Sequence, residues 1–244
     1  MNTLQLKPLH FASVSGGKDS LYMLAHILHN LDLYPLDGVV HFELEIDFPW
    51  VKNVVDYMEQ ECKKYNIPFY RIKPSVSWFE LYEKWGFPNR HVRWCNSKYK
   101  MDCCKQLKDF LKTKGYRPVF YIGFCADEKK RFKKDDNIYP LSELGIYETT
   151  ILEWAKNQEI FNDYYKYNKR QGCMFCPMSS MDRLAYLCLY YPEEFETMFK
   201  MCKDTEAKYN TSIFQSNPKY NSEYIERRVK GHYVPILKEK IERR

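Results

Sequence analysis

The sequence contains no long uninterrupted hydrophobic run. No segment approaches the roughly 20 apolar residues that a transmembrane helix requires, so we expect no membrane partner. The first residues also lack the apolar core of a secretory signal peptide. We therefore expect a cytoplasmic protein.

The nine cysteines are an odd number, which does not suit a framework of disulfides. In a reducing compartment, this usage points to metal binding, redox chemistry or ordinary burial. Internal repeats, low-complexity linkers and coiled-coil heptads are also lacking, so the oligomeric state stays open. A chain of 244 residues that is 45% hydrophobic favours one substantial α/β domain with a small appendage.

The net charge of +6 is unevenly distributed. Residues 219–244 contain eight Lys or Arg but only four Asp or Glu, and residues 129–134 form a second basic run. Such runs are usually solvated faces, and no RNA-binding signature accompanies them. A nucleic-acid acceptor and a small-molecule acceptor both stay open.

Strand-like and helix-like segments alternate along the first two thirds of the chain. The predicted strands are 11–14, 36–42, 68–72, 119–124 and 138–141, and the predicted helices are 20–30, 49–65, 76–85, 97–114 and one that begins at a capping box over 150–153. This order predicts an α/β fold, a Rossmann-like and mostly parallel five-stranded sheet with helices on both faces. We predict a nucleotide-binding domain over residues 1–165, and over 166–244 a small helical part with a cysteine knuckle and a basic tail.

The segment Ser13-Val-Ser-Gly-Gly-Lys-Asp-Ser20 joins the first predicted strand to the first predicted helix. Two glycines let the backbone approach a ligand, and the N–H groups at a helix start point toward an anion. A lysine adds a positive charge, and the serines add hydroxyl donors. We therefore predict a pyrophosphate site made of Ser13, Ser15, Gly16, Gly17, Lys18, Asp19 and Ser20, in which Asp19 can cap the helix and hold Mg²⁺.

This segment differs from the common G-x-x-x-x-G-K-[ST] phosphate loop. That pattern requires Gly and then Ser or Thr where this chain has Ala12 and Asp19. His41, at the end of the second predicted strand, could contact the adenine, although a core or rim histidine is an equal alternative.

A second group of residues centres on Gly172-Cys-Met-Phe-Cys-Pro177. The flanking glycine and proline favour a tight turn that directs both thiolates to one point, which suits Zn²⁺ or an iron–sulfur cluster. We predict Cys173, Cys176 and Cys95 as ligands, because Cys95 precedes a helix whose N-terminus favours thiolate. Candidates for the fourth ligand are Cys103, Cys104, Cys125 and His91, and an open iron position or a bound solvent molecule is the alternative. The alternative is a redox disulfide between Cys173 and Cys176, while Cys62, Cys188 and Cys202 are interpreted as packed side chains.

The Ser-Gly-Gly-Lys-Asp-Ser loop resembles the signature of the PP-loop superfamily. Further segments resemble its phosphoadenosine phosphosulfate (PAPS) reductase branch, namely Glu45 to Pro49, Arg93 to Lys100, Tyr121 to Arg131, Tyr139-Pro-Leu and Gly-Cys-x-x-Cys-Pro. The resemblance covers roughly residues 10 to 185. It implies binding of ATP, or of the sulfonucleotides adenylyl sulfate (APS) or PAPS, with chemistry at the α-phosphate. It also implies that Gly123 belongs to the nucleotide site.

Two departures from this branch bear on the activity. Cys125 stands where the branch usually has arginine, and the chain lacks the C-terminal Glu-Cys-Gly-Leu-His segment whose cysteine attacks the sulfonucleotide. We therefore expect an ATP-dependent adenylating enzyme, in which a substrate oxygen attacks the α-phosphorus. The expected catalytic residues are Lys18, Asp19, Asp127, Glu128 and Arg131. Asp19, or the pair Asp127 and Glu128, would hold Mg²⁺, and Arg131 or Lys129 would pair with the α-phosphate.

Sulfur from a donor could then displace AMP by way of the cysteine group. A sulfonucleotide reductase that uses thioredoxin is the first alternative. The second is an adenine-nucleotide-binding module with a structural zinc and no turnover.

Overall fold

The computed structural model describes residues 6–132, 136–215 and 217–243. The chain forms two compact units whose segments alternate along the sequence. The first consists of Met1–Leu44, Phe48–Ser75 and Lys100–Tyr165, and the second of Glu45–Asp47, Val76–Tyr99 and Lys166–Arg244. The predicted domain division after residue 165 stays a prediction.

The first unit is built on a parallel sheet. Its strands are β1 (Lys7–Val14), β2 (Gly38–Phe42), β3 (Phe69–Ile72) and β4 (Tyr116–Ile122), in the order β3-β2-β1-β4. All neighbouring strands pair in parallel. The chain leaves β1 toward β2 on one side and later returns to β4 on the other side. The carboxyl ends of β1 and β4 therefore form a topological switch point, which is where open α/β sheets bind ligands.

The prediction of a fifth strand at 138–141 is wrong for the described residues. Ile138 forms one isolated bridge with Tyr121, in which the Ile122 N–H donates to the Ile138 carbonyl and the Ile138 N–H donates to the Phe120 carbonyl, both at 2.9 Å. Two residues later, Pro140 begins the short helix α5 (Pro140–Glu143). Proline has no N–H for a ladder but suits a first helical turn, so the strand ends after one bridge.

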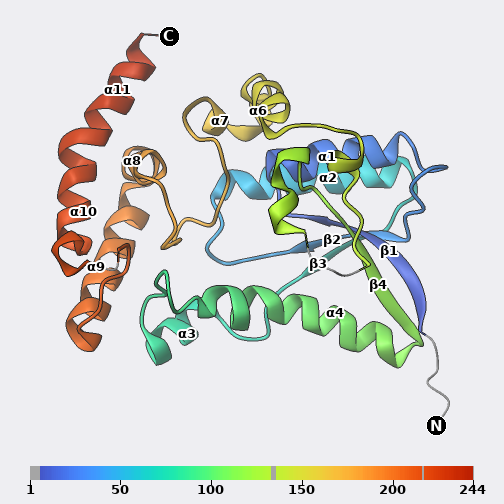
Figure 1. Ribbon diagram of the computed structural model, residues 1–244, viewed down its shortest axis with the longest axis horizontal. Helices are drawn as coiled ribbons and strands as arrows, with labels where there is room; N and C mark the ends of the chain where they lie inside the picture. Colours follow the sequence, from blue (N-terminus) through green and yellow to red (C-terminus); the bar gives the residue numbers. More distant parts are fainter. Residues whose placement is uncertain (1–5, 133–135, 216, 244) are drawn as a thin grey trace. The chain divides into compact units, whose positions relative to one another are not determined.

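Helices cover both faces of this sheet, as predicted (Figure 1). Helices α1 (Lys18–Leu28) and α2 (Pro49–Lys64) lie on one face and α4 (Met101–Thr113) on the other. A buried cluster joins α4 to the strands, and its members are Phe11, Val40, Cys104, Leu107, Leu111 and Phe120. The predicted α/β class with a parallel sheet is therefore confirmed.

Helix α6 (Glu148–Lys156) packs on α1, where the rings of Tyr22 and Trp154 meet edge to face at 5.2 Å. It does not begin at the predicted capping box over 150–153. Tyr147 is its N-cap residue, and the Asp127 carboxylate accepts the Glu148 N–H at 3.1 Å. A side chain from a distant segment thus takes the place of the local cap.

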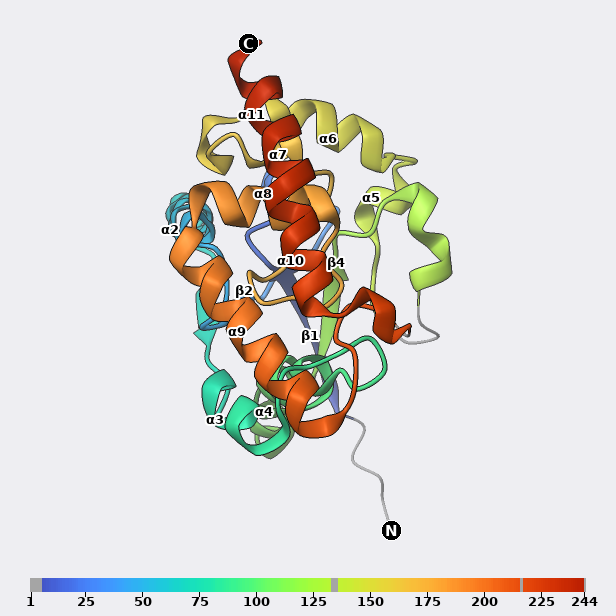
Figure 2. The same cartoon turned by 90° about the vertical axis from the view of Figure 1, so that its left-hand side faces the viewer.

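The second unit is mainly helical, as predicted for the region after residue 165. Figure 2 shows α10 and α11 lying along α8 and α9. The remaining elements of the chain are α3 (Trp78–Trp85), the π-helix η1 (Cys95–Lys100), η2 (Ala126–Arg131), η3 (Glu159–Phe161), α7 (Tyr164–Tyr167), α8 (Met181–Tyr190), α9 (Pro192–Tyr209), η4 (Pro218–Tyr220), α10 (Ser222–Arg228), η5 (Val229–Tyr233) and α11 (Val234–Glu242). Over the described ranges, no helix has the length and apolar character needed to cross a membrane.

Candidate functional site

The loop between β1 and α1 depends on two close backbone approaches. Gly16 has a φ of +73°, and a Cβ there would lie 2.7 Å from Val51 Cγ1. Gly123 follows β4, and a Cβ there would lie 2.9 Å from the carbonyl oxygen of Asp19. Both positions therefore require glycine. The predicted residue Gly123 thus lies against the start of α1, at the switch point between β1 and β4.

One hydroxyl group, that of Ser20, closes this loop. The Ser20 hydroxyl accepts the Ser15 N–H at 3.2 Å and donates to the Gly17 carbonyl at 2.9 Å. Gly17 is the N-cap residue of α1 and has no side chain with which to cap it. Asp19 lies in the first turn, so the expectation that it caps the helix is wrong. A helix start of this kind favours an anion through its N–H groups and dipole.

The side chain of Lys18 is only 1% exposed and lies between two carboxylates. Its Nζ is 2.7 Å from Asp19 Oδ1 and 3.5 Å from Glu148 Oε1. Its backbone N–H donates to the hydroxyl of buried Tyr165 at 2.9 Å. Burial raises the pKa of Asp19, although the ammonium of Lys18 acts in the opposite direction. The structure therefore adds Glu148 and Tyr165 to the predicted loop residues, and no local sequence spacing indicates either of them.

Three of the predicted catalytic residues lie in the segment after β4, and each of them has a structural partner. Glu128 is 8% exposed; its carboxylate accepts the Cys125 N–H at 3.3 Å and pairs with Arg131. Arg131 also stacks over the ring of Phe124, at 4.1 Å from the centroid. Asp127 holds the start of α6, as described above. A role for these residues in catalysis stays a prediction.

Cys125 contacts the loop directly. Its Sγ lies 3.7 Å from Asp19 Oδ1, and burial raises the pKa of this thiol far above its ordinary value. The neutral thiol therefore donates a hydrogen bond to the carboxylate. Cys125 therefore contributes a short neutral donor beside Asp19.

His41 forms a hydrogen bond with the end of β1. It is 3% exposed, and its Nδ1 lies 3.0 Å from the Val14 carbonyl oxygen. A carbonyl only accepts, so Nδ1 carries the proton and Nε2 is left as an acceptor. Burial lowers the pKa of His41, which keeps the ring neutral at pH 7. Contact with adenine stays a prediction.

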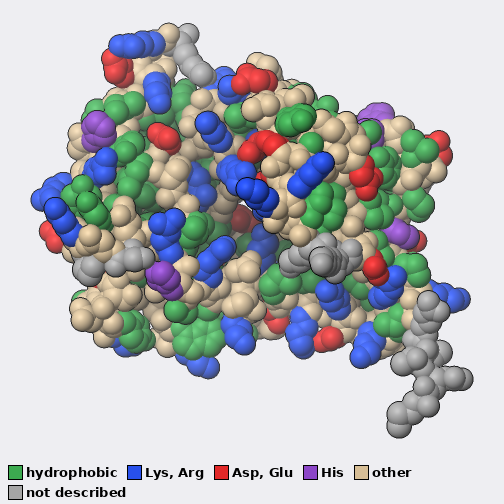
Figure 3. Space-filling view, viewed as in Figure 1, with side chains coloured by type: hydrophobic (Ala, Val, Ile, Leu, Met, Phe, Trp, Pro, Cys, Tyr) green, Lys and Arg blue, Asp and Glu red, His purple; other side chains and the backbone are tan. Residues whose placement is uncertain are grey.

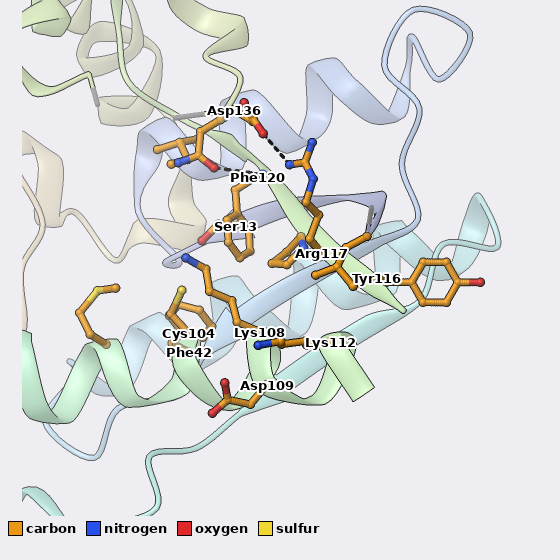
Figure 4. Close-up of a pocket in the computed structure, with 15 residues that line it drawn as sticks. Ser13, Phe42, Cys104, Lys108, Asp109, Lys112, Tyr116, Arg117, Phe120 and Asp136 are labelled. Atoms are coloured by element: carbon orange, nitrogen blue, oxygen red, sulfur yellow. Dashed lines mark hydrogen bonds and ion pairs between the residues drawn. The ribbon is translucent and has the colours of Figure 1, made fainter. Parts of the chain in front are cut away.

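A pocket of about 520 Å³ opens between α4 and β4 (Figure 4). Phe42, Phe120 and Cys104 are among its apolar lining residues, and Lys108 extends from α4 toward the strands. Ser13, from the predicted pyrophosphate site, and Cys104, a candidate for the fourth cysteine-site ligand, both line this pocket. The pocket therefore reaches the end of β1, which leads into the glycine loop.

The predicted cysteine ligands all belong to the second unit. The Cys173 thiol donates a hydrogen bond to Cys176, and this bond, together with Arg183, lowers the pKa of Cys176. Burial, followed by the negative charge of Cys176, raises the pKa of Cys95 to about 11. Cys95 is thus near enough to respond to the charge of Cys176.

Arg183 supports the cysteine turn from α8 and was not predicted. It is 8% exposed, and its Nη2 donates to the Cys173 carbonyl at 2.9 Å and to the Ser179 hydroxyl at 2.7 Å. A Cβ at Gly172 would lie 2.3 Å from Arg183 Nη1, so the guanidinium occupies the space beside this glycine. The conformation of the turn therefore depends on a buried cation.

The other cysteines are divided between the units. Among the residues that the structure describes, no three or more His, Cys, Asp or Glu side chains are grouped so that they could hold a metal ion. Of the candidates for a fourth ligand, Cys103, Cys104 and Cys125 are buried in the first unit, and His91 is exposed in the second. Cys62 and Cys202 are fully buried and Cys188 is half-buried.

On the face shown in Figure 3, Lys and Arg side chains lie among acidic and hydrophobic ones. In the tail, Lys230 pairs with Glu196 and Glu226, so part of the positive charge is neutralised internally. In the other basic run, residues 129–131 are exposed, whereas residues 133 and 134 lie outside the described ranges.

No protein-family model matches the chain. Among curated proteins, the uncharacterised protein MJ0973 of Methanocaldococcus jannaschii is 29% identical over 206 residues, which are 78% of this chain and 47% of that protein. The chain thus spans about half the length of this relative. Among solved structures, the U34-tRNA thiolase NcsA from Methanococcus maripaludis, solved with its 4Fe-4S cluster, has 16% identity and a TM-score of 0.38, over 87% of this chain and 76% of that one. Similarity at this TM-score does not establish a shared fold.

Proposed function

We propose that the chain is an ATP-dependent enzyme that adenylates a substrate, releases pyrophosphate and transfers sulfur to that substrate. The observation that supports this most is the loop of residues 15–20, which meets Gly123 backbone to backbone at the switch point. A glycine loop at a helix start places N–H donors on a phosphate group. The site would hold the β- and γ-phosphates of ATP and leave the α-phosphorus open to attack.

Residues of the first unit would act on the leaving group. A substrate oxygen attacks the α-phosphorus, the bond to the bridging oxygen breaks, and pyrophosphate departs with its electron pair. Lys18 and the loop N–H groups would stabilise the negative charge that develops on pyrophosphate. Asp19, in the first turn of α1, would hold Mg²⁺, which when bound would add positive charge beside the pyrophosphate.

The cysteine turn of the second unit suits a thiophilic metal group by its donor chemistry. Cys95, Cys173 and Cys176 offer soft sulfur ligands, which iron–sulfur clusters and zinc both accept. A group held by these residues would supply a binding position for sulfur. Arg183 would orient the turn and balance the negative charge of the thiolates.

The sulfur step balances with a donor at the oxidation level of hydrosulfide. The sulfur atom attacks the activated carbon, a C–S bond forms, and the C–O bond to AMP breaks. AMP leaves with the bonding electron pair, and no oxidant or reductant is consumed. A small molecule and a nucleic acid that carry a carbonyl oxygen both satisfy this chemistry as acceptors.

Product analysis tests the proposal. Anaerobically purified protein is incubated with Mg²⁺, hydrosulfide, RNA and small-molecule fractions, and ATP labelled at the α- or γ-phosphorus. We expect labelled AMP from the first ATP and labelled pyrophosphate from the second. Formation of ADP and phosphate would contradict attack at the α-phosphorus.

Two parallel assays separate the alternatives. Sulfite release from APS or PAPS with thioredoxin would replace the proposal by sulfonucleotide reduction. Tight binding of ATP without turnover in any fraction, together with zinc that is lost only on unfolding, would identify a nucleotide-binding module.

A further inference from the structure

The electrostatic surroundings of Lys18 are unusual for a residue whose proposed partner is a phosphate. At 1% exposure its ammonium has little access to water, and two carboxylates already neutralise it. A buried ammonium is costly unless it is paired, so these carboxylates stabilise the folded chain without a nucleotide. A phosphate that approaches Lys18 would therefore compete with these carboxylates for its three N–H donors.

The two contacts of Lys18 are not equivalent. The Nζ to Asp19 Oδ1 distance of 2.7 Å is that of a charge-assisted hydrogen bond. The distance to Glu148 Oε1 is 3.5 Å, so this contact is an ion pair of longer range. Asp19 is the next residue in the same helical turn, whereas Glu148 comes from a separate helix. The contact with Glu148 is consequently the weaker of the two and the easier to exchange.

Glu148 is held in position by its own helix. It is the first residue of α6, where a carboxylate interacts favourably with the helix dipole. Asp127 accepts its backbone N–H at 3.1 Å, and the contact between Tyr22 and Trp154 holds α6 against α1. The carboxylate of Glu148 is therefore presented to Lys18 by packed structure rather than by a mobile loop.

We propose that Glu148 is a positioning residue that competes with the phosphates of the nucleotide for Lys18. Without nucleotide, Glu148 and Asp19 keep the ammonium inside the protein. When phosphate binds, Lys18 leaves Glu148 and retains Asp19. This inference rests on the proposed function, because it assigns pyrophosphate binding to the glycine loop.

The test uses inorganic pyrophosphate without Mg²⁺ as the probe, titrated by calorimetry into the full chain and its variants. Glu148→Gln removes the competing charge but keeps the shape, and we expect it to bind pyrophosphate about fivefold more tightly, the scale of one partly exposed ion pair. Glu148→Asp withdraws the carboxylate by one methylene, so we expect a smaller gain. Glu153→Gln is the matched control on α6, because Glu153 is 69% exposed and pairs with Lys156. It should bind as the wild type does.

The direction of the change separates competition from a structural role. A residue that only supports the loop would lose affinity on substitution. Unchanged or weaker binding by Glu148→Gln would overturn the inference. If the glutamine variant does not fold, unchanged or weaker binding by Glu148→Asp overturns it in the same way. Pyrophosphate that binds neither the wild type nor the variants would instead contradict the proposed function.

Discussion

The glycine loop and the cysteine turn achieve their geometry in different ways. The loop is contiguous in sequence. Its conformation depends on two glycines, because a Cβ at either position would lie less than 3 Å from a neighbouring atom. The cysteine turn depends instead on one buried cation, Arg183, which donates to a backbone carbonyl and a hydroxyl. Adding a side chain at one of these glycines should therefore disturb the loop, whereas removing the side chain of Arg183 should disturb the turn.

The strongest test of the loop is the removal of its charge. We expect Lys18→Met to slow AMP formation about 100- to 1000-fold, the scale for loss of one donor to a developing negative charge. The measurement is the initial rate at saturating ATP, with circular dichroism to verify folding. Lys105→Met is the control, since Lys105 is 75% exposed and pairs with Asp109. A rate within threefold of the wild type would show that Lys18 does not act on the leaving group.

Removal of the buried cation tests the cysteine turn. We expect Arg183→Met to lower the free energy of unfolding by about 2–3 kcal/mol, because it leaves buried acceptors without a charged donor. Urea unfolding gives this value, and Arg227→Met, on an exposed position of α10, is the control. Equal stability of the two variants would mean that the cysteine turn keeps its conformation without Arg183.

Addition of one methyl group tests the close approach in the loop. We expect Gly123→Ala to lower the free energy of unfolding by about 1–2 kcal/mol, because its Cβ would meet the Asp19 carbonyl oxygen. The control is Gly231→Ala, where a Cβ has no neighbour within 4 Å. Thermal unfolding of both variants measures the difference, and a neutral Gly123→Ala would show that β4 and α1 can move apart.

The smallest expected effect concerns His41. Burial lowers its pKa below the ordinary value of 6.5, so the unfolded chain binds a proton that the folded chain resists. Stability associated with His41 is therefore present above pH 6.5 and is lost as the pH falls below it. Between pH 7.5 and 5.5, the free energy of unfolding of the wild type should fall more than that of His41→Gln, by at most about 1.4 kcal/mol, which corresponds to one pH unit below 6.5. Equal losses would show that His41 titrates normally.

These regions also differ in how far the sequence predicted them. The alternating periodicities in the sequence predicted the order of strands and helices, and the helix that follows the glycine loop buries Leu21, Leu24 and Leu28. The prediction of a fifth strand was wrong because Ile138 forms a single bridge and Pro140 then begins a helix. A short apolar run in the sequence does not distinguish a single bridge from a strand. The prediction of a capping box over 150–153 was wrong because α6 begins earlier, at Glu148, and its first N–H donates to Asp127 from a distant segment of the sequence.

The same distinction applies to the candidate site. The residues of the loop are neighbours in sequence, so their types and order predict an anion site directly. Glu148, Tyr165 and Arg183 are brought to their partners by tertiary packing, and no spacing along the chain indicates them. A single sequence therefore does not indicate the site residues whose side chains reach their partners from another element of the fold.

The central claim is that the loop of residues 15–20 binds a pyrophosphate group. The most direct measurement is calorimetric titration of the anaerobically purified protein with pyrophosphate, ATP and AMP, including competition between the first two. The account predicts that pyrophosphate and ATP compete for one site and that AMP binds at least about 100-fold more weakly, since two charge-assisted hydrogen bonds to phosphate account for that ratio. AMP that binds as tightly as ATP, or pyrophosphate that does not compete, would contradict it.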